Sequence, residues 1–64
     1  MKRWIEFETV EGNMIDIDKR MIVALAFNPD EAHVRIEYGL GFVADVKGTI
    51  AEIRADIDSG PIPA

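Results

Sequence analysis

The chain has 64 residues and no cysteine, and its twelve Asp and Glu outnumber its seven Lys and Arg, which gives a net charge of −5. This length supports one hydrophobic core, and the lack of cysteine excludes disulfides and thiolate metal sites as a source of stability. The negative charge disfavours nucleic acid and anionic membranes, and no apolar run approaches the roughly 18 residues of a membrane-spanning helix. We therefore expect one soluble, cytoplasmic domain over residues 1–58, with a flexible tail at residues 59–64.

The first two strands are predicted by alternating apolar and polar residues. The alternation has period two over residues 4–10 and again over residues 14–18, which predicts a hairpin. A loop over residues 11–13 keeps the two faces of the hairpin separate, and it places Asn13 where a positive φ is tolerated. The buried face of this hairpin then carries Ile5, Phe7, Thr9, Ile15 and Ile17.

This register concentrates negative charge on the outer face of the hairpin. It places Glu8 opposite Asp16 and Glu6 opposite Asp18, although like charges directly opposite one another destabilise a sheet. A basic partner would relieve this repulsion. Alternatively, the hairpin is twisted enough for solvent to screen the charges, or cations from neighbouring elements neutralise the acids. The candidate cations are Lys19, Arg20, Arg35 and Lys47.

A continuous apolar run over residues 21–27 predicts the third strand, and the Asn28-Pro29-Asp30-Glu31 segment after it is a strong turn signal. Because no polar residue interrupts the run, we predict a central strand. Pairing Phe27 with Ala32 across the turn separates the two faces of the sheet again. The inner face of this pair then holds Val23, Leu25, Phe27, Val34 and Ile36.

The next turn contains Gly39, Leu40 and Gly41, whose two glycines supply the flexible positions of a three-residue hairpin loop. This loop pairs Tyr38 with Phe42. Further along the same hairpin it places two opposite charges across from each other, Arg35 and Asp45.

After this hairpin the apolar spacing becomes that of a helix. One stripe predicts a helix from Val46 onward, and Thr49 with Glu52 forms a capping-box pattern, with Asp45 as a competing N-cap. Gly48 lies near the helix start, where a residue without a side chain lets a helix approach a sheet closely. The apolar stripe consists of Val46, Ile50, Ile53 and Ile57.

The helix is expected to end at Ser59-Gly60-Pro61. Together these elements predict an α+β fold, a small antiparallel β-meander of four to five strands in a single sheet, with one C-terminal helix packed on one sheet face. One helix covers one face, so the other face is solvated or bound to a partner. Exposed Trp and Met are enriched where proteins meet, and the partner-binding residues predicted on this outer face are Trp4, Glu6, Glu8, Met14, Asp16, Asp18 and Arg35.

Enzyme and metal chemistry find little support in the sequence. A metal site built from the hairpin carboxylates with His33 is an alternative, because hard cations take several oxygen ligands, but residues 16–20 lack the glycine and the glutamate of a calcium loop. His33 is the only histidine, and it has no cysteine to pair with. We expect no catalytic residue, no cofactor and no bound metal.

The turns also carry a resemblance to a known family. Glu11-Gly12-Asn13, the Asn28-Pro29-Asp30 turn before an alternating strand, and the glycine turn at Gly39 that leads toward a helix with spaced isoleucines form this pattern. Over about residues 3–57 the chain resembles the small FlbD-like flagellar accessory proteins of bacteria. It differs in its stronger acidity and in Gly41. The resemblance implies a small non-enzymatic accessory protein and supplies no catalytic residues.

Two hypotheses for the function follow. The first is a protein-interaction module that forms a homo-oligomer through an open sheet face or edge, because the core is small and the outer face carries apolar residues. The second is an acidic inhibitor of the phage anti-CRISPR type, a nucleic-acid mimic that presents the hairpin carboxylates to a basic protein surface. A module that binds nucleic acid directly would need a basic surface, whereas no more than two basic residues are consecutive here.

Overall fold

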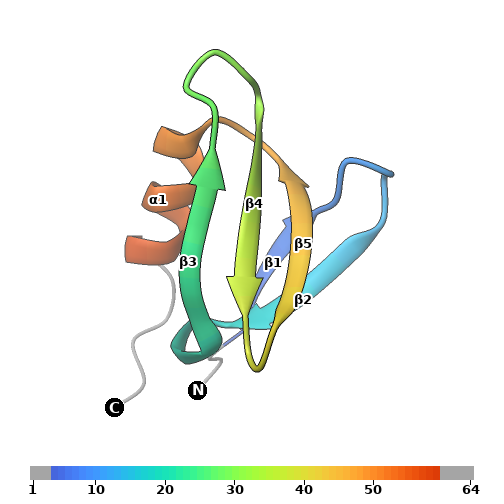
Figure 1. The fold of residues 1–64 in the computed structure, drawn as a ribbon, viewed down its shortest axis with the longest axis vertical. Coiled ribbons are helices and arrows are strands. Elements are labelled where there is room, and N and C mark those ends of the chain that lie inside the picture. The colour runs from blue at the N-terminus through green and yellow to red at the C-terminus, as the bar shows by residue number, and fades with distance from the viewer. Residues whose placement is uncertain (1–3, 60–64) are drawn as a thin grey trace.

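The computed structural model describes residues 4–59 and contains five antiparallel strands and one C-terminal helix (Figure 1). This confirms the predicted α+β meander. A single turn of 3₁₀ helix, η1, joins the second strand to the third. The elements are β1 (Trp4–Glu8), β2 (Met14–Asp18), η1 (Lys19–Met21), β3 (Ile22–Phe27), β4 (His33–Tyr38), β5 (Phe42–Lys47) and α1 (Ile50–Ser59).

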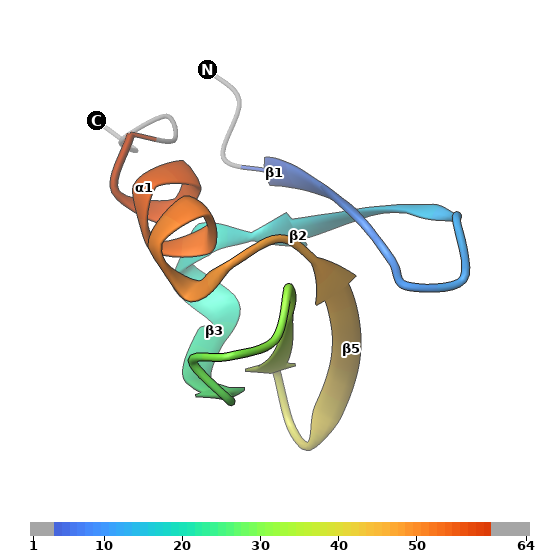
Figure 2. The ribbon, with the colours of Figure 1, turned by 90° about the horizontal axis from the view of Figure 1, so that it is seen from above.

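The strands form two sheets instead of the predicted single one, because β1 leaves β2 at its end and turns to β5. The sheets have the orders β1-β2 and β3-β4-β5. Thr9 forms a bridge with Val46, and the Val10 N–H donates to the Asp45 carbonyl at 3.0 Å. Figure 2 shows the β1–β2 hairpin and α1 on the same side of the three-stranded sheet. The hairpin and the helix therefore cover its inner face together.

The core forms where the hairpin, the three-stranded sheet and α1 meet. β1 and β4 contribute alternate residues, as the period of two predicts, and β2, β5 and the helix contribute one buried residue each. β3 contributes only the partly buried Ile22 and Leu25. Burying a side chain of this size stabilises a fold by about 1.5–3 kcal/mol. The buried apolar residues are Ile5, Phe7, Ile17, Val34, Ile36, Val46 and Ile53.

The register of the first hairpin differs by two residues from the predicted one. Phe7 lies opposite Ile15 instead of Ile17, because Thr9 belongs to a longer loop in which its N–H donates to the Asn13 carbonyl at 2.7 Å. The positive φ lies at Gly12, with a value of 92°, and not at Asn13. A shift of two residues keeps every side chain on its face, so the predicted buried residues of the hairpin remain inside.

The third strand is an edge strand, and the prediction of a central strand is wrong. β3 pairs with β4 only, and Phe27 lies opposite Val34 instead of Ala32. The Ala32 carbonyl instead accepts a hydrogen bond from the Gly48 N–H, with a donor–acceptor distance of 3.0 Å. A bulge between Ile22 and Ala24 turns Val23 outward, where 72% of its surface is exposed. The predicted inward position of Val23 is therefore also wrong.

The turn at Gly39 and the pairing on either side of it are as predicted. Tyr38 lies opposite Phe42, and Arg35 lies opposite Asp45. In a three-residue hairpin loop the register follows from the loop itself. No distant residue is needed to set it.

The helix begins at Ile50, four residues later than predicted. Val46 is buried as a residue of β5, and Asp45 lies in the same strand, so Asp45 is not a helix cap. The capping box is confirmed: the Thr49 N–H donates to Glu52 Oε1 at 3.0 Å, and the Glu52 N–H donates to Thr49 Oγ1 at 3.3 Å. The last described helical residue is Ser59. The rest of the predicted stop signal and the predicted tail, residues 60–64, lie outside the described residues.

Gly48 lies between β5 and α1, where the backbone passes close to the side chain of Ile53. Its φ is +125°, and a Cβ atom there would lie 3.3 Å from Cδ1 of the buried Ile53. A backbone of this kind costs a residue with a side chain about 1–3 kcal/mol. The sequence-based explanation of Gly48, a close approach of helix and sheet, agrees with this geometry.

We therefore expect Gly48→Ala to lower the free energy of unfolding by about 1–3 kcal/mol, measured by urea denaturation. Gly12→Ala is the matched control, because Gly12 also has a positive φ, but a Cβ atom added to it would meet no atom within 4 Å. The loss at Gly48 should exceed the loss at Gly12. Equal losses would show that the contact with Ile53 contributes nothing.

Candidate interaction surface

The acids of the first hairpin are less crowded than the sequence predicts. Because of the shifted register, Glu6 lies opposite Asp16, whereas Glu8 lies opposite Met14. Trp4 lies opposite Asp18. One directly opposed acid pair therefore replaces the two that were predicted.

Two of the four predicted acids have cationic partners from neighbouring elements. Lys47 Nζ donates to Glu8 Oε2 at 3.0 Å across the junction of the two sheets. Arg20 Nη2 donates to Asp18 Oδ2 at 3.2 Å, and the Arg20 N–H donates to Asp18 Oδ1 at 2.9 Å. The alternative in which neighbouring cations neutralise the acids is thus correct for Glu8 and Asp18.

Asp18 belongs to the structure of the fold and not to its outer face. Only 8% of its surface is exposed, and its side chain caps η1. An Asp at such a position satisfies a backbone N–H that the turn leaves free. Its assignment to the partner-binding surface is corrected for this reason.

The remaining hairpin residues form an exposed surface. Glu6 and Asp16 lie opposite each other at its centre, and within residues 4–59 no ion pair joins either one to a cation. Trp4 and Met14 are exposed on the same face, by 48% and 58%. This set, defined here as the acidic hairpin face, consists of Trp4, Glu6, Glu8, Met14 and Asp16.

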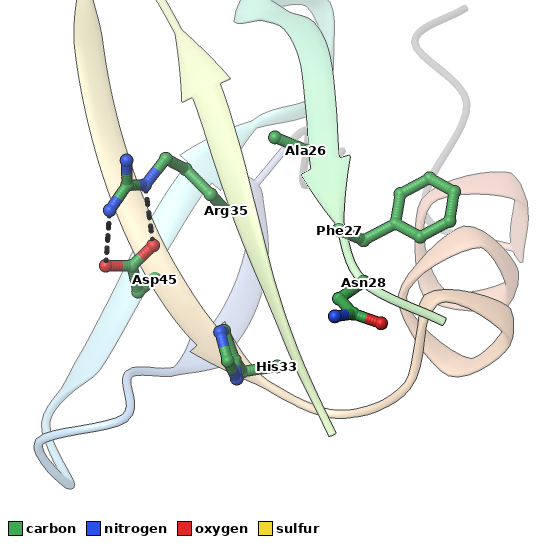
Figure 3. Close-up of a pocket in the computed structure, with 6 residues that line it drawn as sticks. All are labelled: Ala26, Phe27, Asn28, His33, Arg35 and Asp45. Atoms are coloured by element: carbon green, nitrogen blue, oxygen red, sulfur yellow. Dashed lines mark hydrogen bonds and ion pairs between the residues drawn. The ribbon is translucent and has the colours of Figure 1, made fainter. Parts of the chain in front are cut away.

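Arg35 lies apart from the acidic hairpin face, on β4 of the other sheet. Its guanidinium forms two hydrogen bonds with Asp45, Nε to Oδ1 at 2.8 Å and Nη2 to Oδ2 at 3.2 Å (Figure 3). These bonds lower the pKa of the Asp45 carboxyl and raise the pKa of the Arg35 guanidinium. The positive charge of Arg35 is therefore compensated within its own sheet, away from the hairpin.

An open hollow of about 240 Å³ lies beside this ion pair. His33 lines the same hollow from β4 (Figure 3). Its Nε2 lies 3.1 Å from Glu31 Oε2. Among the described residues, no three His, Cys, Asp or Glu side chains are placed to hold a metal ion. The lining residues are Ala26, Phe27, Asn28, His33, Arg35 and Asp45.

An exposed apolar cluster at the end of the three-stranded sheet is not predicted from the sequence. The rings of Tyr38 and Phe42 stack with their centroids 5.8 Å apart. Phe42 is 62% exposed, and Leu40 in the turn is 99% exposed. Met21 of η1 adjoins them, since its Cε lies 3.6 Å from the position of a Cβ on Gly39. We define the apolar tip as Met21, Tyr38, Leu40 and Phe42.

The apolar tip continues the inner face of β4 and β5 beyond the core. Tyr38 and Phe42 face the same side as the buried Ile36 and its partner Ala44, because they follow the same alternation. A sequence signal for it exists: Leu40 occupies a turn position that polar residues and glycine usually take.

Comparison with family models, with curated proteins and with solved structures gives no match for this chain. The resemblance to FlbD-like proteins therefore stays a prediction. The described helix α1 is not long and apolar enough to span a membrane.

We expect the Arg35–Asp45 pair to stabilise the fold in a pH-dependent way. Because the pKa of Asp45 is lowered in the folded state, its contribution is present above the pKa of the unfolded chain and is lost as the pH falls through the folded value. Asp45→Asn should lower the urea midpoint slightly at neutral pH, since the pair is exposed, and should match the parent protein near about pH 2.

The control is Asp58→Asn on the exposed side of α1. It should change the urea midpoint little at either pH. A loss for Asp45→Asn that is equally large in acid would contradict the role of the ion pair.

Proposed function

We propose that this chain is a small, non-enzymatic, cytoplasmic protein-interaction module that self-associates. The observation that carries the proposal is the apolar tip, in which Leu40 and Phe42 are exposed by 99% and 62% and the ring of Phe42 stacks on that of Tyr38. Removing apolar surface from water yields about 25 cal/mol per Å². Exposed apolar clusters of this kind are typical of surfaces where proteins meet.

The size of the core supports the same proposal. Seven buried apolar residues stabilise the described fold, and the chain has no disulfide that would compensate for a small core. Small domains without disulfides or metals often gain the missing stability by oligomerisation. The resemblance to flagellar accessory proteins also points to a non-enzymatic role.

We expect sedimentation equilibrium to give a mass of at least twice the 7.1 kDa monomer at micromolar concentrations. Because each copy carries a net charge of −5, added salt should screen the repulsion between copies and strengthen the association.

Leu40→Asp should weaken the self-association, and Leu40 is exposed enough for the fold to tolerate the change. Val10→Asp, on the loop of the first hairpin, is the matched control. A 7.1 kDa species at all concentrations and salt levels would contradict the proposal.

A second candidate function is the acidic inhibitor that binds a basic protein surface. One observation favours it: Glu6 and Asp16 lie opposite each other without a cation within the described part of the chain. Such a pair costs stability in the free protein. A basic partner would recover this cost on binding.

For this candidate we expect the double variant Glu6→Gln, Asp16→Asn to raise the urea midpoint at low salt, because the repulsion disappears. The gain should shrink in high salt, where the charges are already screened. Glu11→Gln in the exposed loop is the control and should have no comparable effect. If the double variant is no more stable than the parent protein, the two acids are simply solvated and do not destabilise the fold, which would contradict this candidate function.

A further inference from the structure

We infer that β3 is the self-association site, and that a second copy of this chain pairs its own β3 antiparallel to it across a two-fold axis. The three-stranded sheets of the two copies would then form one six-stranded sheet. This inference rests on the proposed self-association and specifies which surface of the chain forms the interface between the two copies. It starts from the unexpected position of an uncharged strand at a sheet edge.

In the described part of the chain, β1, β2, β3 and β5 each lie at a sheet edge, and β1 and β5 meet only through the bridge between Thr9 and Val46. β2 pairs with β1 alone, and β3 pairs with β4 alone. A free edge offers unpaired backbone N–H and C=O groups to any approaching strand. Natural proteins block such edges with charges, with proline or with bulges.

The edge strands differ in charge. β2 has the sequence Met-Ile-Asp-Ile-Asp and thus carries two acids, whereas β3 has the sequence Ile-Val-Ala-Leu-Ala-Phe and carries no charge and no proline. Each of the other four strands contains charged residues. Because two copies of a chain with net charge −5 repel each other, they approach most favourably where neither presents an acid. β3 meets this condition and β2 does not.

The shape of β3 leaves room for another strand. Its bulge is confined to the segment between Ile22 and Ala24, and residues 24–27 keep a regular register with β4. The outward side chains of Ala24 and Ala26 are small and exposed. The neighbouring charge of Arg35 on β4 is compensated by Asp45. The strand itself is uncharged, and the acid nearest to it across the sheet is the exposed Glu37 on β4, opposite Ala24.

Antiparallel pairing also gives the apolar tip a partner. The start of β3 adjoins Met21 of the tip, and the strand ends at Phe27, which is 41% exposed. A two-fold axis across β3 places the start of one strand beside the end of the other. The tip of one copy would then lie near Phe27 of its partner, and apolar contacts would add to the backbone hydrogen bonds of strand addition.

The symmetry restricts the register. Residues directly opposite each other in an antiparallel pair point to the same face of the sheet. For a pairing centred on residues 24–26, where β3 keeps a regular register with β4, continuous faces place the outward Ala24 opposite itself or Ala26, or place Ala26 opposite itself. All three registers bring two alanine Cα atoms to about 4.5–5.5 Å, within the range of a disulfide.

Single cysteines test the pairing directly, because the chain contains no cysteine of its own. We expect Ala24→Cys, Ala26→Cys or an equimolar mixture of the two to form a disulfide-linked dimer on oxidation, seen on a non-reducing gel. Met14→Cys on the edge strand β2 is the matched control and should stay uncrosslinked. Crosslinking at Met14 in place of the alanines, or no crosslinking in any combination although the parent protein is a dimer, would overturn the inference.

Substitutions at two exposed valines distinguish a dimer that pairs through the β3 edge from one that packs through the outer sheet faces. Val23 lies on β3, and Val43 lies on the outer face of β5, and both are more than half exposed. Val23→Lys should raise the dimer dissociation constant at least about tenfold, and Val43→Lys should change it less than about twofold. Circular dichroism should be measured on both variants as the control that each is still folded.

The outcomes distinguish the inference from the proposed function. If Val43→Lys disrupts the dimer and Val23→Lys does not, the copies associate through their outer faces, so the inference fails while self-association stands. If both variants remain dimers, β3 is not the interface. A parent protein that is monomeric throughout would overturn the proposed self-association itself.

Discussion

The bridge between Thr9 and Val46 is the contact on which the rest of the structure depends. Through it and the adjoining hydrogen bond from Val10, the end of β1 leaves β2 and joins β5, so that the two sheets enclose a core. The hairpin loop must be long enough to allow this departure, and the register of β1 with β2 follows from the loop. That register decides which acids face each other on the hairpin.

The enclosure that results is incomplete. One hairpin and a ten-residue helix cover the inner face of β3-β4-β5, but the end that carries Tyr38 and Phe42 extends beyond them. A chain of this size has no further element among its described residues to close this end. The apolar tip and the uncharged edge of β3 adjoin each other at Met21, so a single partner surface would cover both.

Electrostatics directs where such a partner fits. Three ion pairs, those of Glu8 with Lys47, Asp18 with Arg20 and Asp45 with Arg35, compensate acids locally. The acids that remain still give every copy a negative field. Repulsion therefore protects the β2 edge and the acidic hairpin face from a second copy, whereas β3 lacks this protection.

The sequence by itself determined the faces of the strands other than β3, the turn at Gly39 with its Arg35–Asp45 pair, and the Thr49–Glu52 capping box, because periodicity and short loops are local properties. It also indicated most of the acidic hairpin face. Only the tertiary structure decided the registers next to the longer loops, where distant partners bind the backbone of Thr9 and Ala32. A shift of two residues leaves the face of each side chain unchanged, so alternation cannot detect it. For the same reason the burial of Asp18, the edge position of β3 and the exposed end of the core depend on long-range contacts.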